Sequence, residues 1–137
     1  MDRKEIQKLE QFFRTKFKLP TIEIRQRPRK DGSAEVFIGD EFIGVLFRDE
    51  DEGELSYNFR MVIDLGAQAE VLPIHLTSYL KRKFDNENIR VVARPKKQDS
   101  LEVFIGEEFI AVLFVEIEKN RRIFILELPI LDVDLAG

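Results

Sequence analysis

The 137-residue sequence has no cysteine, no tryptophan and a single histidine. Without cysteine, the chain cannot form a disulfide, a thiolate-ligated zinc site, an iron–sulfur cluster or a thiol nucleophile. It also has no apolar run near the roughly 20 residues that cross a bilayer, and its first residues lack the apolar segment of a secretory signal. Together these absences predict a soluble protein of a reducing cytoplasm.

Charge is nearly balanced in total but alternates along the chain. The sequence has 22 Lys+Arg against 26 Asp+Glu, for a net charge of -4 and a pI of about 5.2. Residues 1–30 carry 10 basic and 4 acidic side chains, and residues 31–70 carry 2 and 11. The pattern then repeats, with 7 and 3 in residues 71–100 and 3 and 8 in residues 101–137.

The sequence contains two copies of one unit. At an offset of 67 residues, Ser33 to Phe47 aligns with Ser100 to Phe114, and 12 of these 15 positions are identical. Self-similarity at a fixed spacing is the mark of a tandem duplication. We therefore divide the chain into a first repeat, residues 1–68, and a second repeat, residues 69–137, which together form one globular unit.

Each repeat is predicted to be a helix followed by four strands. The first helix begins at Asp2, with Glu5 three residues later as in a capping box, and ends before Pro20. Gly39 and Gly106 each separate two apolar, β-rich runs and are predicted hairpin turns. Residues 55–65 alternate apolar and polar side chains, as in a strand buried on one face. The fold class is α+β, with two α-β-β-β-β repeats and antiparallel sheets.

The hairpin strands of each repeat are apolar on both faces. One helix can cover only one face of its sheet, so the other face needs a second layer or a partner. We expect the two repeats to pack as a pseudo-dimer, either as a sandwich or as one continuous sheet.

The repeated text is also similar to a known family. The segments Ile89 to Lys97, Glu35 to Phe47 and Asp51 to Phe59, each in its place after a helix, resemble the short alphaproteobacterial proteins grouped as domain of unknown function 3126. Those proteins are usually a single copy, so this chain resembles a tandem duplication of one. The resemblance implies a bacterial, cytoplasmic origin and supplies no activity. The second repeat departs from the pattern after Phe114.

No residue set predicts catalysis, a metal or a cofactor. His75 has Lys8 as its counterpart in the first repeat, and Ser33 and Ser100 lack the glycines of a nucleophile elbow. The acidic run at residues 49–54 lacks EF-hand spacing and is not retained in the second repeat. We therefore predict that the protein is not an enzyme and that its catalytic, metal and cofactor sites are absent.

Basic residues cluster in two equivalent loops that could contact phosphates or an acidic protein. They are Arg25, Arg27, Arg29, Lys30, Arg90, Arg94, Lys96 and Lys97. The acidic pI and the lack of aromatic residues beside these loops count against nucleic acid. Alternatively, the loops are solvated or pair with acidic residues of the other repeat.

Two further segments are candidate contact surfaces. One is Ser56, Tyr57, Asn58 and Phe59, which the first repeat alone retains. The other is an apolar outer face of the last strand, formed by Ile123, Ile125 and Leu131, unless another part of the protein covers it. We predict a non-enzymatic protein-interaction or adaptor module whose partner is another protein and which is itself a monomer (pseudo-dimer) or a weak homo-oligomer. The alternative is a nucleic-acid- or ribosome-associated factor that uses the basic loops.

Overall fold

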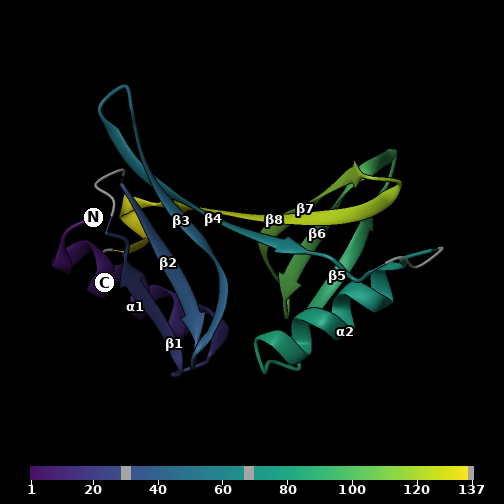
Figure 1. Ribbon diagram of the computed structural model, residues 1–137, viewed down its shortest axis with the longest axis horizontal. Coiled ribbons are helices and arrows are strands. Elements are labelled where there is room, and N and C mark those ends of the chain that lie inside the picture. The colour runs from purple at the N-terminus through teal and green to yellow at the C-terminus, as the bar shows by residue number, and fades with distance from the viewer. Residues whose placement is uncertain (29–31, 67–69, 136–137) are drawn as a thin grey trace. The chain divides into compact units, whose positions relative to one another are not determined.

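The computed structural model describes residues 1–28, 32–66 and 70–135, with Gln98 described by its backbone alone. Over these residues it is an α+β protein with two α-helices, one short 3-10 helix and one eight-stranded sheet, in the strand order β1-β2-β3-β4-β8-β7-β6-β5 (Figure 1). The elements of the first repeat are α1 (Arg3–Phe17), β1 (Ile22–Gln26), β2 (Ser33–Ile38), β3 (Glu41–Asp51) and β4 (Glu54–Ile63). Those of the second are α2 (Pro73–Lys83), β5 (Ile89–Arg94), β6 (Lys97–Ile105), β7 (Glu108–Glu118), β8 (Arg121–Leu131) and the short 3-10 helix η1 (Asp132–Leu135).

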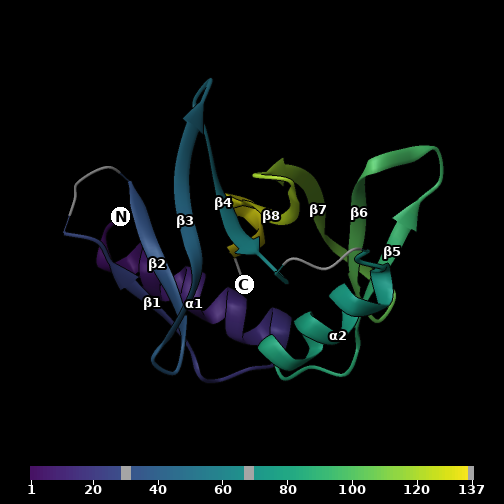
Figure 2. The same cartoon turned by 45° about the vertical axis from the view of Figure 1, so that its right-hand side comes forward.

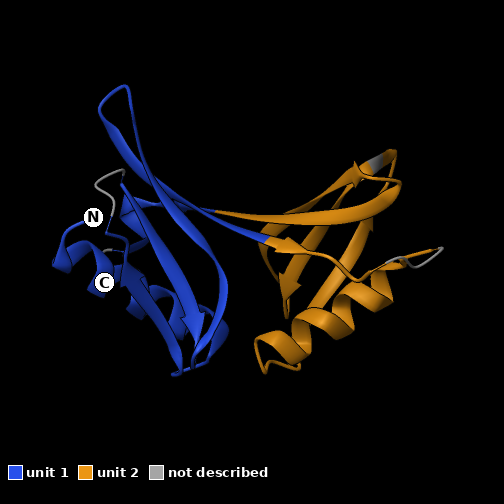
Figure 3. Ribbon diagram, viewed as in Figure 1, with its two compact units in different colours: residues 1–61, 129–137 blue, residues 62–128 orange. Residues whose placement is uncertain are grey.

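The chain forms two compact units whose limits differ from those of the sequence repeats (Figure 3). Unit 1 consists of Met1–Met61 together with Pro129–Gly137, and unit 2 is the continuous segment Val62–Leu128. The end of β8 therefore belongs to unit 1, where η1 contacts α1.

The sequence of α1 explains where this helix begins, ends and packs. The Asp2 side chain accepts a hydrogen bond from the Glu5 backbone N–H at 2.8 Å, and Glu5 accepts one from the Asp2 N–H at 3.0 Å. This confirms the predicted capping box. The helix ends at Lys18, whose φ of 51° is left-handed. Its buried stripe, Leu9, Phe13 and Phe17, recurs at helical spacing.

In unit 1, β1 to β4 pair in sequence as an antiparallel meander, and β3 and β4 lie side by side to their shared turn (Figure 2). Val36 and Leu46 are fully buried on the face that α1 covers, where the ring of Phe13 lies 5.2 Å from that of Phe59. We call this the inner face. Because side chains alternate along a strand, the neighbours of these residues lie on the outer face.

Unit 2 repeats this arrangement with a shorter helix. The α2 residues Leu76 and Leu80 are buried, and α2 packs on β5. The helix begins after Leu72, whose backbone N–H donates to His75 Nδ1 at 2.9 Å. The single histidine of the chain thus satisfies the backbone at the start of a helix.

Most predicted elements agree with the structure. Gly39 and Gly106 have φ values of 60° and 61° in the β2–β3 and β6–β7 turns, a conformation that glycine adopts without strain. The alternation in residues 55–65 corresponds to β4, in which Tyr57, Phe59, Met61 and Ile63 are buried. The second predicted basic loop, which includes Lys96 and Lys97, is instead a tight turn, because Lys96 adopts a left-handed φ of 65° and β6 begins at the next residue.

Candidate binding faces

The outer face of unit 1 exposes a row of phenylalanines. Phe37 of β2 is in register with Phe42 of β3, and their rings meet edge to face at 5.8 Å. Phe47 is paired with Ser33 and Asn58, one residue beyond the inner-facing Leu46. Phe42 and Phe47 are 50% and 42% exposed. We call Phe37, Phe42 and Phe47 the aromatic face of unit 1.

Unit 2 carries the same row at the offset of 67 residues. The rings of Phe104 and Phe109 meet edge to face at 5.8 Å, and Phe109 and Phe114 are 49% and 39% exposed. In both units the strand register shifts just before the first phenylalanine of the row, at Phe37 and at Phe104. The shift places Phe37 opposite Phe42, and Phe104 opposite Phe109, on the same face of the sheet. Phe104, Phe109 and Phe114 form the aromatic face of unit 2.

An arginine from the first strand of each unit covers one ring of its aromatic face. The Arg25 guanidinium carbon lies 3.9 Å from the centre of the Phe37 ring, and that of Arg90 lies 4.8 Å from the Phe104 ring. Arg25 Nη2 also donates to the Gly39 carbonyl at 3.5 Å, and Arg90 Nε donates to the Gly106 carbonyl at 3.1 Å. Both guanidinium groups therefore combine a cation–π contact with a hydrogen bond to the adjacent turn.

These two arginines are not at aligned positions. At the offset of 67, Arg25 corresponds to Val92, and Arg90 corresponds to Glu23. The two units thus deliver a guanidinium to the same ring and the same turn carbonyl from different places on the strand. In unit 1, Arg25 pairs with Glu23 and Asp40 at 3.1 and 3.5 Å, and the hydrogen bond that it donates to Glu23, ahead of that to Asp40, raises the pKa of Arg25.

A second arginine in each unit does occupy an aligned position. Arg27 Nη1 donates to Ser33 Oγ at 3.3 Å, and Arg94 Nη1 donates to Ser100 Oγ at 3.1 Å. Both serines are buried, so the arginines satisfy hydroxyl groups that have little access to water. This contact gives the repeated serines a structural role.

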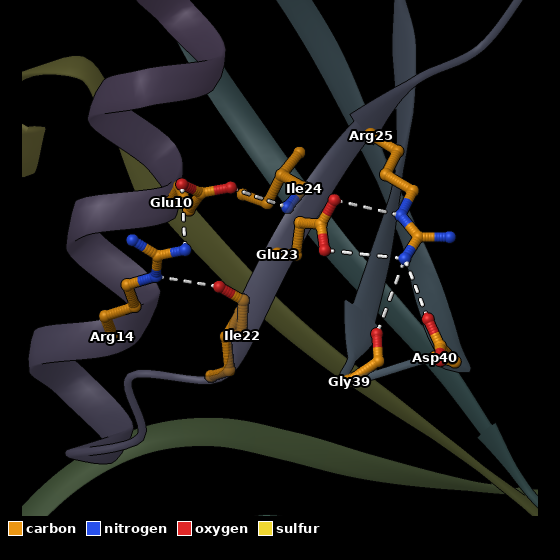
Figure 4. Close-up of polar contacts among 8 residues, drawn as sticks. All are labelled: Glu10, Arg14, Ile22, Glu23, Ile24, Arg25, Gly39 and Asp40. Carbon is orange, nitrogen blue, oxygen red and sulfur yellow. Dashed lines mark hydrogen bonds and ion pairs between the residues drawn. The ribbon is translucent and has the colours of Figure 1, made fainter.

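Helix side chains close the outer edge of β1 in unit 1 (Figure 4). Arg14 Nε donates to the Ile22 carbonyl at 2.8 Å, and the Ile24 backbone N–H donates to Glu10 Oε2 at 3.0 Å. Glu10 and Arg14 also pair with each other at 3.1 Å. In unit 2, the Val91 backbone N–H donates to Thr77 Oγ1 at 2.9 Å, so the aligned helix position again supplies the acceptor. Such contacts protect an edge strand from pairing with another chain.

A polar network in unit 1 joins the start of α1 to the β3–β4 hairpin. Tyr57 Oη donates to Glu5 Oε2 at 2.6 Å, and Arg48 Nε donates to the same oxygen at 2.7 Å. Burial raises the pKa of Glu5, but the hydrogen bonds from Tyr57, the Asp2 N–H and Arg48 outweigh it and lower that pKa. Burial, followed by the bond to Glu5, raises the pKa of Tyr57. The phenol therefore stays protonated at neutral pH and serves as a hydrogen-bond donor.

Comparison with known families identifies the family of this chain. A family model described as protein of unknown function, DUF3126, matches residues 5–65 and again residues 74–134. The chain belongs to the DUF3126 family. It is a tandem duplication of the family's unit, as its internal repeat predicts. No curated protein and no solved structure matches it.

The other predicted site residues of this DUF3126 protein lie in different surroundings. Lys96 and Lys97 are exposed at the β5–β6 turn, whereas Arg29 and Lys30 lie outside the described residues. In the Ser56–Phe59 segment, Tyr57 and Phe59 are buried, and Ser56 and Asn58 are half-buried. Phe59 packs in the core of unit 1 and Tyr57 joins the network with Glu5, so the segment that the first repeat alone retains is mainly structural.

The predicted apolar surface on β8 is largely covered. Ile123 and Ile125 are 8% and 4% exposed, whereas Leu131 is 54% exposed. The structure therefore contradicts the expectation of an exposed row and agrees with the alternative that other parts of the protein cover it. The alternation of side chains along β8 identified the two faces of the strand but could not show which face is exposed to solvent.

The structure also corrects the view that no aromatic residue accompanies the basic loops of this DUF3126 protein. Arg25 and Arg90 lie over Phe37 and Phe104, because the hairpin register brings the second strand beside the first. The exposed phenylalanines were the missed candidates. Their signal was present in the sequence, since all three positions of each aromatic face are identical between repeats.

In residues 1–28, 32–66 and 70–135, no group of three or more His, Asp or Glu side chains is placed to hold a metal ion. No helix in the same ranges combines the length and the apolar character that a membrane span requires.

Proposed function

We propose that this protein is a non-enzymatic protein-interaction module that binds its partner through the two aromatic faces. The observation that carries the proposal is that all three aromatic-face positions are phenylalanine in both repeats, although four of the six side chains are exposed and the other two, Phe37 and Phe104, are half-buried. The copies have diverged elsewhere, since Ser56 to Phe59 aligns with Ile123 to Leu126, and these segments share no residue. The two repeats have therefore had time to diverge, so the identity of the aromatic-face phenylalanines needs another cause, such as binding.

Physical chemistry supports this assignment. An exposed phenylalanine ring on a rigid strand loses little conformational entropy on binding and removes a large apolar area from water. Phe42 and Phe47 are 50% and 42% exposed, and Phe109 and Phe114 nearly as much, so each face offers adjacent anchors. Aromatic residues clustered in this way are typical of the energetically dominant part of protein interfaces.

Nucleic-acid binding is the second candidate. It is favoured by the placement of Arg90 and Arg94 on the same face as Phe104, a combination that suits phosphate contact and base stacking. It is opposed by Glu102 and Glu107, which would repel phosphates. Fluorescence anisotropy with labelled single-stranded RNA, from about 50 to 200 mM salt, tests it through the expected steep loss of affinity with salt.

We also infer that the two repeats act as a pseudo-dimer in a cytoplasmic protein. Support comes from the duplication itself, because a helix covers one face of each unit's sheet and leaves the other apolar. A family member with one copy would then be a homodimer, and light scattering would give twice its chain mass. A monomeric single-copy protein would reject this inference.

Site-specific photo-crosslinking tests the proposed interaction. A photoreactive phenylalanine analogue replaces Phe42 in one variant and Phe109 in another, and each is expressed in cells of the source organism. The matched control carries the analogue at Ile117, an apolar β7 residue that is 78% exposed and lies outside both faces. We expect the same protein to crosslink at positions 42 and 109 but not at 117. Equal crosslinking at all three positions, or none at 42 and 109, would reject the proposal.

A further inference from the structure

We propose that each aromatic face recognises an arginine side chain of the partner, so that one chain offers two guanidinium sites. This inference rests on the proposed function and names the chemistry of the same faces. The partner segment would carry an arginine beside apolar residues. Its guanidinium would stack on an exposed phenylalanine ring and pair with a nearby carboxylate, and its apolar residues would contact the other rings.

The protein's own arginines indicate what the faces bind. Arg25 and Arg90 start from strand positions that do not align, yet each guanidinium lies over the equivalent ring and donates to the equivalent glycine carbonyl. Two different side-chain paths thus end in one arrangement. The ring and the turn carbonyl therefore form a site that suits a guanidinium however it is delivered.

The remaining rings of each face have room for another cation. Within the described part of the chain, no cation lies over Phe42 or Phe47 in unit 1, or over Phe109 or Phe114 in unit 2. Asp40, which also pairs with Arg25, and Glu107 are exposed residues of the turns that precede Phe42 and Phe109. A guanidinium bound on either ring would have a carboxylate of the same unit close by, which strengthens a hydrogen-bonded cation–π contact.

Arginine fits these faces better than lysine or an anionic ligand. Its guanidinium is flat, weakly hydrated and able to stack on a ring while donating several hydrogen bonds, whereas an ammonium ion is compact and strongly hydrated. A phosphate would approach the carboxylates Glu102 and Glu107, and the net charge of -4 opposes it further. Charge complementarity therefore favours a basic protein segment.

A set of three synthetic peptides provides the probe. The first is acetyl-Leu-Arg-Leu-Arg-Leu-amide, and in the other two citrulline or lysine replaces both arginines. Citrulline keeps the shape of arginine and removes its charge. Each is titrated into the full chain, and ring resonances of Phe42 and Phe109 are followed by NMR. We expect the arginine peptide to bind both faces, about fivefold more tightly than the citrulline peptide, with lysine in between.

Variants assign the binding to the rings. Phe42→Leu and Phe109→Leu keep an apolar side chain and remove the π face, and both positions are about half exposed, so the fold should tolerate them. Each variant should weaken binding of the arginine peptide about two- to fivefold at its own face and leave the other face unchanged. The control is Phe12→Leu, an α1 residue outside both faces, and thermal unfolding checks that every variant is folded.

The outcomes separate this inference from the proposed function. Equal affinity for the arginine and citrulline peptides, or no shift of either ring, would overturn guanidinium recognition. Crosslinking of one protein at positions 42 and 109 would then still support the interaction module. Tighter binding of a single-stranded uridine oligonucleotide than of the arginine peptide would also overturn the inference and would favour the nucleic-acid alternative.

Discussion

Units 1 and 2 have the same arrangement of a helix and four strands, but they stabilise it with different side chains. Unit 1 ties α1 to its hairpin through Glu5, Arg48 and Tyr57, which share one carboxylate oxygen. At the offset of 67, unit 2 has Leu72, Val115 and Phe124, which carry no charge and no hydroxyl. A partly buried polar network in unit 1 and three apolar side chains in unit 2 thus occupy aligned positions in one chain.

The core of the two units differs in the same compensated way. Gly44 of unit 1 corresponds to Ala111 of unit 2, and Phe59 corresponds to Leu126. A Cβ at Gly44 would lie 2.6 Å from both the Arg60 carbonyl oxygen and the Phe59 ring. The Phe59 ring therefore requires the small residue Gly44 beside it. Exchanging one of the two residues without the other tests this difference between the units.

The largest effect is expected for Gly44→Ala. The added methyl group overpacks unit 1, and we expect it to destabilise the protein by about 3 kcal/mol in urea unfolding followed by circular dichroism. Combining it with Phe59→Leu should reproduce the pair found in unit 2. The two effects should then be non-additive by at least about 1 kcal/mol, and strict additivity would show that ring and glycine are not coupled.

Tyr57→Phe should have the next largest effect. It removes a hydrogen bond to a charged acceptor and should cost about 2 kcal/mol at pH 7. Because the folded state lowers the pKa of Glu5, the stabilisation is present above the unfolded pKa of about 4.3 and is lost as pH falls through the lower folded value. The difference between variant and wild type should therefore shrink at pH 3. A loss of stability independent of pH would contradict this account.

Smaller losses of stability are expected from the helix side chains that bond to the edge strands β1 and β5, which differ between the two units. Glu10→Val removes the carboxylate that accepts from the Ile24 N–H and pairs with Arg14, so about 1 kcal/mol of stability should be lost. Thr77→Val removes the acceptor of the Val91 N–H in unit 2 and should lower the stability of the protein by a similar amount. Hydrogen exchange should quicken at Ile24 in the first variant and at Val91 in the second. Faster exchange at both amides in either variant would mean that the effect is global.

The smallest effect is expected at Arg121, whose side chain pairs with Asp64 in unit 2. Both side chains are substantially exposed, so Arg121→Gln should change stability by less than about 0.5 kcal/mol. Urea unfolding at low and high salt checks this expectation. A larger loss would place this ion pair among the contacts that hold unit 2 together.

Local patterns in the sequence predicted the elements but not the contacts between their side chains. Repetition, the capping residues Asp2 and Glu5, and alternation along β4 depend on near neighbours in the chain, so they can be recognised without a structure. The placement of Arg25 over Phe37 depends on strand register and on an irregularity at Val36, which alternation does not reveal. The burial of Ile125 likewise depends on distant packing.

The division of the chain also bears on the order in which the units can be completed during synthesis. Unit 2 is one continuous segment, whereas unit 1 needs Pro129–Leu131 of β8 and the η1 residues that contact α1. A ribosome that has added Leu128 has therefore synthesised every residue of the second unit while the first still lacks part of its sheet. The part of the protein that is synthesised first is the part that can be finished only last.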